Sequence, residues 1–214
     1  TMVIATEGKK GWFWFIPLHD DITSIGVVAG YDHLFKESGL KEFEDIYFHQ
    51  VDRCPGVKAL IEGATRCDQF RAQKEYSYRA KQVAGDGWVL VGDAYGFLDP
   101  LYSSGVLLAL TSANLAADAV GDALAANDVS VSRLRVWEAD YVKAIERMRN
   151  LVCAFYDGLN FGQLVRRNPD KKGLITDVLI GNLFKDEVDE LWPLIEELNA
   201  ENAKKEADAA LSAV

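Results

Sequence analysis

GWVLVGDAYGFLDPLYSSG, residues 87–105, is the stretch that decides the predicted fold. Residues 88–91 form a continuous apolar run without alternation, which is typical of a strand covered on both faces. Gly92 and Asp93 end this run, and open α/β sheets bind their ligands at the carboxyl ends of strands. We therefore expect a buried strand, a sharp turn, a loop, and a helix that begins near Ser104.

The end of this stretch leads into the helix. Ser103, Ser104 and Gly105 precede the apolar residues 106–110. A Ser at a helix start can cap backbone N–H groups, and such N–H groups attract anions. Asp93 adds an acceptor for hydroxyl groups at the same edge. We predict a site here for a planar ligand and a small anion. The alternative is an ordinary strand–loop–helix connection with a capping serine.

Composition limits the classes of partner. The 214 residues carry a formal net charge of −10, which argues against nucleic acid and anionic membrane surfaces as main partners. No apolar run reaches the length of a membrane span, so we expect none. Cys54, Cys67 and Cys153 show no metal-ligand spacing. We therefore expect reduced thiols, a cytoplasmic location and no metal site.

The first part of the chain predicts a β-hairpin followed by helices. Residues 12–30 contain two strongly β-forming runs that are separated by turn residues. Residues 32–51 and 55–64 carry apolar side chains at roughly helical spacing. We expect residues 65–83 to form one or two extended segments that lead into the central strand.

The second part of the chain predicts helices. Residues 104–126 are rich in Ala and Leu and form the helix that follows the central loop. A longer helix begins at Val131 or Ser132 and carries apolar residues at three- and four-residue steps. We expect further helices over residues 175–184 and 189–198. Together with the hairpin and the central strand, these helices predict a mixed α/β fold.

Two motifs stand out from this background. The first is Trp12-x-Trp14-x-Ile16-Pro17, on the predicted first strand, where alternate residues share a face. An aromatic packing stripe is the alternative explanation for it. The second motif directly follows the Gly-Asp pair and reads Phe97-x-x-Pro100-x-x-Ser103-x-Gly105.

These motifs carry a family resemblance. Gly92-Asp93, followed by Pro100 and Gly105, resembles the second FAD-contacting motif of the aromatic hydroxylase and geranylgeranyl reductase flavoproteins. Together with the tryptophan motif, the loop resembles the narrower group of flavin-dependent halogenases, over about residues 12–126. The resemblance implies the C-terminal portion of a two-domain FAD-dependent oxidoreductase.

The resemblance also implies a division into three parts. Residues 1–84 would hold the antiparallel sheet and helices of the substrate side, residues 85–130 part of the FAD-binding domain, and residues 131–214 a C-terminal helical region. The family's opening Gly-x-Gly-x-x-Gly is absent, and no Lys lies in the family's catalytic context. We therefore assign no catalytic residue and expect the chain to be inactive by itself.

Cofactor-binding roles follow from the same resemblance. The Asp93 carboxylate would hold ribityl or ribose hydroxyl groups of FAD, and Gly92 would let the backbone approach the diphosphate. Pro100 and the loop after it, with Ser103 and Gly105, would lie along the isoalloxazine ring. The backbone N–H groups of Ser104 and Gly105 would hold chloride or bromide. The tryptophan motif would separate the flavin from the substrate, through Trp12, Trp14, Ile16 and Pro17.

The implied activity is oxidation of chloride or bromide with reduced FAD and O2, which halogenates an aromatic or carrier-tethered substrate. A flavin reductase would supply the reduced FAD. Tyr102 occupies the position where tryptophan-specific members carry a Glu. This favours a phenolic, pyrrolic or carrier-tethered substrate over free tryptophan. Two alternatives stay open: an FAD-dependent monooxygenase or geranylgeranyl-reductase-like oxidoreductase of the same superfamily, and a non-catalytic binding module.

Overall fold

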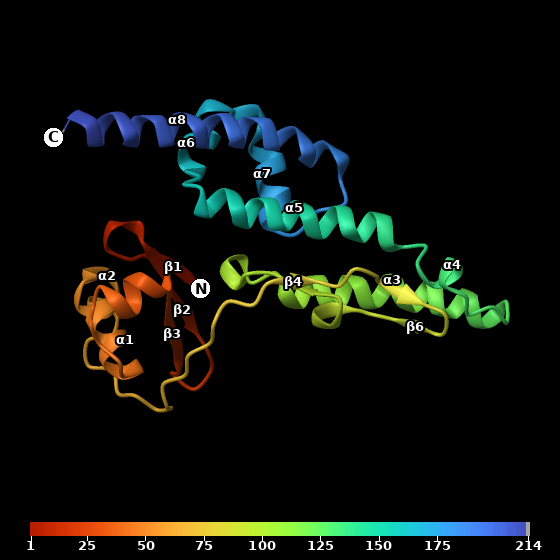
Figure 1. Ribbon diagram of the computed structural model, residues 1–214, viewed down its shortest axis with the longest axis horizontal. Coiled ribbons are helices and arrows are strands. Elements are labelled where there is room, and N and C mark those ends of the chain that lie inside the picture. Colours follow the sequence, from red (N-terminus) through yellow and green to blue (C-terminus); the bar gives the residue numbers. More distant parts are fainter. Residues whose placement is uncertain (213–214) are drawn as a thin grey trace. The chain divides into compact units, whose positions relative to one another are not determined.

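The computed structural model describes residues 1–212 and divides the chain into two compact units, Thr1–Lys74 and Glu75–Val214 (Figure 1). The first unit is a small sheet with helices, and the second consists mainly of helices with short strand pairs. This confirms the mixed α/β fold class. The boundaries expected from the resemblance, at residues 84/85 and 130/131, both lie inside the second unit.

The sheet of the first unit is antiparallel, and its strand order is β1-β2-β3. Its strands are β1 (Met2–Ala5), β2 (Gly11–Pro17) and β3 (Thr23–Ala29). The pairing of β2 with β3 confirms the predicted hairpin, and its register sets Trp12 opposite Val28 and Trp14 opposite Gly26. Because side chains alternate along a strand, Phe13 points to the other face. There it forms a core with residues of the helices that follow.

Those helices are shorter than the sequence predicts. The expected helix over residues 32–51 is wrong in its middle: a π-helix, η2 (Asp32–Lys36), and an α-helix, α1 (Phe43–Asp52), replace it. Gly39 between them has a φ of +68°, outside the helical region. The Ser38 hydroxyl donates to the Leu34 carbonyl at 2.6 Å and accepts from the Leu40 N–H at 3.2 Å, which ends the first helix. The next helix, α2, covers Pro55–Leu60.

The central strand differs most from the prediction. Only Trp88–Val89 is a strand, β6, and it pairs with β5 (Ala84–Gly85) across Gly87, whose φ is +78°. Trp88 is 43% exposed, so the expectation of a strand covered on both faces is wrong here. A strand covered on both faces belongs to a wide sheet. Among the described residues, β6 pairs with β5 alone.

The segment before this hairpin is mostly irregular. The extended segments expected over residues 65–83 reduce to β4 (Tyr78–Arg79), which pairs with β7 (Gly96–Phe97). Trp88–Val89 and Gly96–Phe97 thus belong to two separate strand pairs. Two short 3-10 helices lie in the central stretch, η3 (Gly92–Ala94) and η4 (Pro100–Tyr102).

The helices of the second unit follow the predicted order. The predicted helix over residues 104–126 is confirmed as α3, and the long helix from Val131 divides in two because residues 135–137 form a turn. Figure 1 shows α8 running along α5. The helices are α3 (Gly105–Ala125), α4 (Val131–Leu134), α5 (Glu138–Tyr156), α6 (Phe161–Arg167), α7 (Lys172–Leu179) and α8 (Leu191–Ser212).

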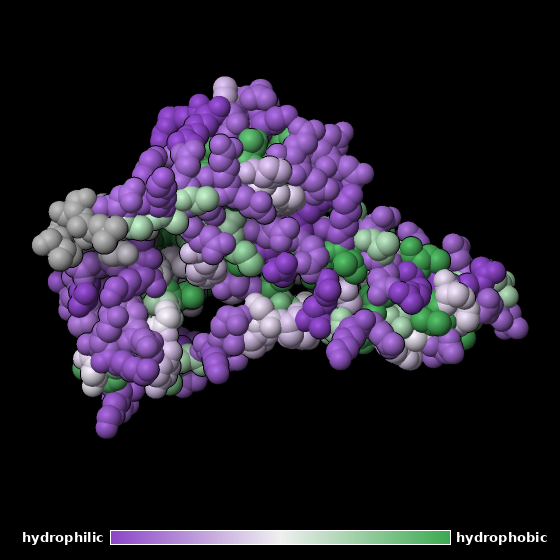
Figure 2. Space-filling view, turned by 45° about the horizontal axis from the view of Figure 1, so that its top comes forward, coloured by the Kyte–Doolittle hydropathy of each residue, from purple (hydrophilic) through white to green (hydrophobic). Residues whose placement is uncertain are grey.

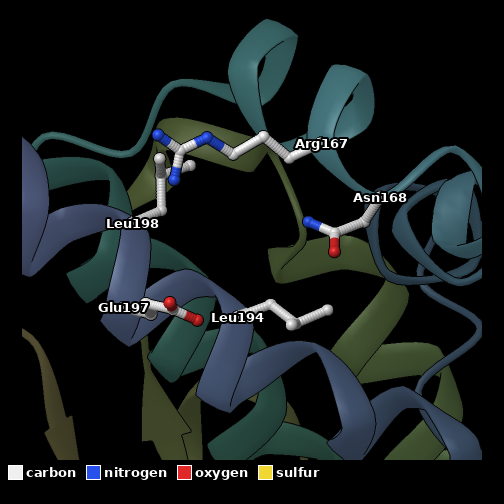
Figure 3. Close-up of a pocket in the computed structure, with 5 residues that line it drawn as sticks. All are labelled: Arg167, Asn168, Leu194, Glu197 and Leu198. Atoms are coloured by element: carbon white, nitrogen blue, oxygen red, sulfur yellow. The ribbon is translucent and has the colours of Figure 1, made fainter.

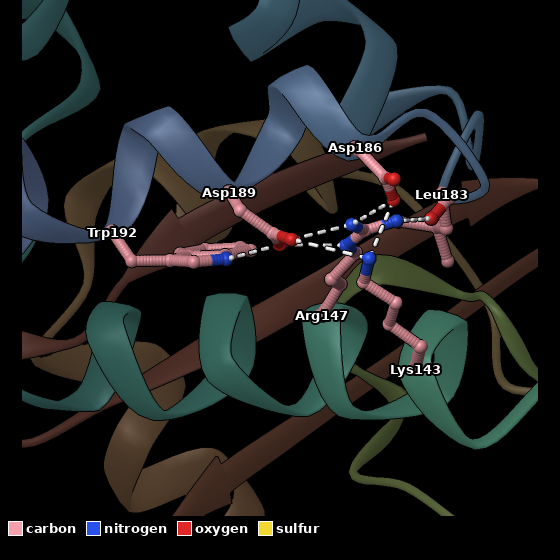
Figure 4. Close-up of polar contacts among 6 residues, drawn as sticks. All are labelled: Lys143, Arg147, Leu183, Asp186, Asp189 and Trp192. Atoms are coloured by element: carbon pink, nitrogen blue, oxygen red, sulfur yellow. Dashed lines mark hydrogen bonds and ion pairs between the residues drawn. The ribbon is translucent and has the colours of Figure 1, made fainter. Parts of the chain in front are cut away.

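A buried arginine ties α5 to the segment before α8 (Figure 4). Arg147 is 3% exposed, and its guanidinium donates to both Asp189 oxygens at 2.7 and 2.5 Å. It also reaches the Leu183 carbonyl at 2.6 Å and Asp186 at 3.1 Å. The Arg147 hydrogen bonds are the main cause that lowers the pKa of Asp189 to about 2. Both acidic residues belong to the 3-10 helix η6 (Asp186–Glu190).

One helix is apolar enough to test the expectation that no membrane span is present. By length and composition alone α3 could cross a membrane, so the expectation that no span is present stays a prediction. A core helix meets the same criteria, and five α3 residues are buried: Leu108, Ser112, Ala116, Ala119 and Ala123. Figure 2 shows apolar side chains on the surface at its right-hand end, where Figure 1 places β6 and α4. Exposed apolar residues of this part include Trp88, Leu124 and Val136.

Candidate functional site

The turn after the central strand packs against the start of α3. Gly92 has a φ of +53°, which favours glycine, and its N–H donates to the Ser112 hydroxyl at 2.9 Å. The Ser112 hydroxyl in turn donates to the Leu108 carbonyl at 2.9 Å. A Cβ at Gly92 would lie 3.0 Å from the Cβ of Ala109. The close approach that Gly92 permits in this structure is therefore to α3.

Asp93 follows in the same turn, and its side chain is exposed. Its backbone carbonyl accepts a hydrogen bond from the Tyr78 hydroxyl, which comes from β4. Burial raises the pKa of Tyr141, and the Asp93 charge adds to this rise. The Tyr141 hydroxyl itself donates to the Leu108 carbonyl of α3 at 3.1 Å. The backbone of Asp93 is thus held while its carboxylate faces solvent.

The loop that joins this turn to α3 has a defined conformation. The Asp99 carboxylate accepts from the Leu101 N–H at 2.9 Å, and Pro100 begins the 3-10 helix η4. The Ser103 N–H donates to the Pro100 carbonyl at 2.9 Å, and Ser103 itself has a φ of +54°. Both Pro100 and Ser103 are exposed, whereas Leu101 is buried. The loop is therefore a compact turn that is held by the Asp99 hydrogen bond and by the buried Leu101 side chain.

The first turn of α3 presents backbone donors. Ser104 precedes the helix and is buried, but its side chain makes no capping hydrogen bond, so the expected serine cap is wrong. The first N–H groups of an α-helix have no partner within the helix. Gly105, Val106 and Leu107 are exposed, and beyond its own helix turn no heavy atom lies within 4 Å of a Cβ built at Gly105. The start of α3 therefore combines exposed residues with the absence of a side-chain cap from Ser104.

The tryptophan motif lies in the first unit. The Trp12 and Trp14 rings meet edge to face at 6.3 Å, as expected for alternate residues of one strand. The Trp14 indole N–H donates to the Ser24 hydroxyl at 3.1 Å, and a Cβ at Gly26 would lie 2.0 Å from a Trp14 ring carbon. The strand ends with Ile16 opposite Ser24 and Pro17 opposite Thr23. The motif therefore forms an aromatic face on β2, and the candidate cofactor and halide residues all belong to the second unit.

Sequence reasoning missed the polar residues that hold these groups. Ser112 binds the Gly92 N–H, Tyr78 binds the Asp93 carbonyl, and Tyr156 donates to Asp99 at 2.9 Å. The Asp-Pro pair at Asp99 is a turn signal that could have been used. The tyrosines carry no such signal, because Tyr is common both in strands and in helix packing.

Two pockets of the second unit lie elsewhere. One, of about 210 Å³, is lined by residues from the end of α6 and from α8, which are Arg167, Asn168, Leu194, Glu197 and Leu198 (Figure 3). The other, of about 450 Å³, lies between the β4 segment and the start of α5, and includes Arg79, Lys81 and Arg135. Neither pocket is lined by the candidate cofactor or halide residues.

Comparison with known proteins gives a consistent family. Residues 1–160 match the model of the tryptophan halogenase family. The chain is 38% identical over 149 residues to a tryptophan 2-halogenase of Chondromyces crocatus, covering 69% of this chain and 28% of that protein. It is 32% identical over 145 residues to a 1H-pyrrole-2-carbonyl-[peptidyl-carrier protein] chlorinase of Pseudomonas fluorescens, covering 68% of this chain and 32% of that protein.

The fold comparison agrees. The flavin-dependent brominase Bmp2 superposes with a TM-score of 0.77 at 27% identity, covering 92% of this chain and 49% of that structure. The chain thus spans less than half of the length of these relatives. The family match covers the tryptophan motif, the Gly92–Asp93 turn and the loop into α3. This chain belongs to the tryptophan halogenase family.

Proposed function

We propose that this chain supplies the halide-facing part of an FAD-dependent halogenase that oxidises chloride or bromide and halogenates an aromatic or carrier-tethered substrate. One observation carries the proposal. The Gly92–Ala94 turn is held against α3, whose first turn is exposed and has no side-chain cap. A carboxylate and a set of free backbone donors therefore belong to one packed unit, which suits a flavin and an anion together.

The residues present fit these two ligands. The exposed Asp93 carboxylate would accept hydrogen bonds from ribityl or ribose hydroxyl groups of FAD, and Gly92, itself buried against α3, would form the turn beside the diphosphate. Pro100 and Ser103 are exposed on the loop and would lie along the flavin ring. Chloride or bromide would sit on the N–H groups of Ser104 and Gly105, because Gly105 leaves open space where a side chain would stand.

Reduced FAD and O2 supply the two-electron oxidation of the halide when the cofactor is bound. The chain's own contribution is binding and orientation: the helix start fixes the anion, and Asp93 fixes the cofactor. In this proposal Trp12, Trp14, Ile16 and Pro17 separate the flavin from the substrate. The substrate side then comprises residues 1–84, the cofactor side residues 85–130, and the helical region residues 131–214.

The substrate is proposed from the loop and from the relatives. The names of two relatives state a pyrrole-2-carbonyl group on a peptidyl-carrier protein, for chlorination in one and bromination in the other. Another relative is named for tryptophan. Tyr102 gives the loop an aromatic ring in place of a carboxylate. We therefore favour a phenolic, pyrrolic or carrier-tethered substrate, with a flavin reductase as the source of reduced FAD and a cytoplasmic location.

The test uses a family-length protein that contains this chain, supplied with FAD, a flavin reductase, bromide, and a panel of phenols and pyrroles. A product heavier by bromine in place of hydrogen is expected. Asp93→Asn should weaken FAD binding about tenfold, because a carboxylate acceptor is lost, and Asp118→Asn on the exposed part of α3 serves as the matched control. Hydroxylated product without bromine would favour a monooxygenase. Absence of both FAD binding and turnover would favour a non-catalytic module.

A further inference from the structure

The buried carboxylate of Asp99 joins two distant parts of the second unit. Asp99 is 9% exposed, and its Oδ1 accepts from the Leu101 N–H at 2.9 Å. Its Oδ2 accepts from the Tyr156 hydroxyl, also at 2.9 Å. Tyr156 is the last residue of α5, and Leu101 lies within η4. One carboxylate thus connects the end of α5 to the loop that enters α3.

The two hydrogen bonds fix the orientation of this carboxylate. A buried carboxylate is costly unless hydrogen bonds compensate for lost water, and here a separate donor serves each oxygen. Oδ1 holds the backbone of Leu101 within η4, so the orientation of the Asp99 side chain helps to fix η4. Ser104 and Gly105 follow η4 after Ser103 alone, which places their N–H groups next to the segment that Asp99 holds.

Aromatic rings at the end of α5 also pack against the loop. The Tyr102 ring meets Phe155 and Phe161 edge to face, at 6.5 and 6.4 Å. Phe155 meets Tyr156 in the same manner at 5.5 Å. The Tyr102 hydroxyl is buried and has no hydrogen-bond partner among the described residues, so this side chain contributes packing rather than polar contact. Tyr156 makes a directional polar contact from α5 to the loop, through its hydroxyl and Asp99.

We propose that Tyr156, acting through Asp99, is a positioning residue that sets the halide affinity of the N–H groups at the start of α3. This inference rests on the halide site proposed above. It gives the end of α5 a role in the site. Tyr156 lies outside both motifs that carry the family resemblance. Tyr156 does not touch the halide; it holds the loop in the conformation that presents the donors.

The test is a bromide titration of the 15N-labelled chain, followed through the amide signals of Ser104 and Gly105. Tyr156→Phe removes the hydroxyl and keeps the ring. Tyr31→Phe is the matched control, because Tyr31 stacks on Phe35 at 4.8 Å in the first unit. We expect Tyr156→Phe to raise the bromide dissociation constant about threefold to tenfold, and Tyr31→Phe to leave it unchanged. Amide exchange at Leu101 should become about tenfold faster in Tyr156→Phe alone.

A second pair of variants separates positioning from general stability. Asp99→Asn keeps one acceptor oxygen of two, whereas Asp99→Ala keeps neither. Bromide affinity should fall in the order wild type, Asp99→Asn, Asp99→Ala. If the wild-type amide signals respond to bromide and Tyr156→Phe has the same dissociation constant, the positioning role is overturned and the halide site is not. If the wild-type amide signals do not change when bromide is added, the proposed halide site is overturned, and this inference falls with it.

Discussion

Arg147 is a buried cation whose partners all lie between α7 and α8. It binds the Leu183 carbonyl, Asp186 and Asp189; its loss leaves the Leu183 carbonyl without this donor, whereas Asp186 keeps Lys143 and Asp189 keeps Trp192. We expect Arg147→Ala to lower the free energy of unfolding by about 3 kcal/mol, since it removes several charge-assisted hydrogen bonds together with a buried side chain. Urea denaturation at neutral pH measures this loss.

Arg149 provides the control on the same helix. Its side chain is 51% exposed and pairs with Glu146 at 2.6 Å. Exposed pairs contribute about 0–1 kcal/mol, so Arg149→Ala should change the free energy of unfolding by no more than that. Equal losses in the two variants would show that the buried position of Arg147 adds nothing.

Glu37 predicts a pH dependence in the first unit. Hydrogen bonds from Lys10 and then His33 lower the pKa of Glu37 from 4.5 to about 2. A carboxyl group with a lowered pKa stabilises the folded state fully above its unfolded pKa, and this stabilisation is lost as the pH falls toward the folded pKa. The contribution should therefore be constant above about pH 4.5 and vanish near pH 2.

The measurement compares wild type with Glu37→Gln in urea, followed through amide signals of β2 so that only the first unit is observed. The difference between the two midpoints should have its full value above about pH 4.5 and should close as the pH falls through about 2. If the difference between the two midpoints stays constant down to pH 2, Glu37 acts through packing rather than through its charge.

At the scale of elements, the sequence predicted those whose pattern is local. The β-forming runs in residues 12–30 predict a hairpin and the Ala- and Leu-rich residues 104–126 predict a helix, and the structure has both. The strand over residues 88–91 depends on partner strands, which no local pattern states. The helix over residues 32–51 failed because Ser38 and Gly39 redirect the backbone, and the apolar spacing concealed them.

The site shows the same division. Sequence alone could indicate the turn at Gly92 and the helix start at Gly105, since glycines and serines at those positions are strong local signals. It could not indicate that Ser112, Tyr78 and Tyr156 hold the site, because each contact joins residues far apart in the chain. Long-range hydrogen bonds depend on how elements pack, and that is decided by the core.

For two glycines of the second unit, substitution by Ala should change the free energy of unfolding in opposite directions. Gly92→Ala introduces a Cβ at a φ of +53°, 3.0 Å from Ala109, and should lower the free energy of unfolding by about 1–2 kcal/mol. Gly121→Ala lies inside α3 with open space around it and should raise the free energy of unfolding by about 0.5–1 kcal/mol. Urea denaturation of the two variants distinguishes them. A loss in Gly121→Ala would show that this face of α3 is not free.

At the scale of the whole molecule, the chain carries its two family motifs on different units. The tryptophan motif lies on β2 of the first unit, and the Gly92–Asp93 turn lies in the second. The halogenase activity proposed above therefore uses residues of both units, and the chain passes from one unit to the other in the segment around Lys74.

That segment predicts where a protease cuts first. Residues 71–77 are exposed and lack regular structure, and Lys74 is the last residue of the first unit. Arg66, by contrast, binds Glu44 at 2.9 Å and lies 4.9 Å above the Phe70 ring, which holds it to the first unit. Exposed segments that open at little cost are the preferred sites of nicking. Brief trypsin treatment should therefore cut after Lys74 before it cuts after Arg66.

Mass spectrometry should then find two persistent fragments, residues 1–74 and 75–214, because each unit has its own core. Lys74→Gln removes the peptide bond that trypsin should cut first, and the first cut should move to Arg71. Among the ion pairs of the described residues, Arg71 pairs with Asp68 alone. A first cut inside α5, after Lys143, Arg147 or Arg149, would mean that the second unit opens before the joining segment does. The two units would then not be independently stable, and the first-unit stability measured at Glu37 would have to be interpreted for the chain as a whole.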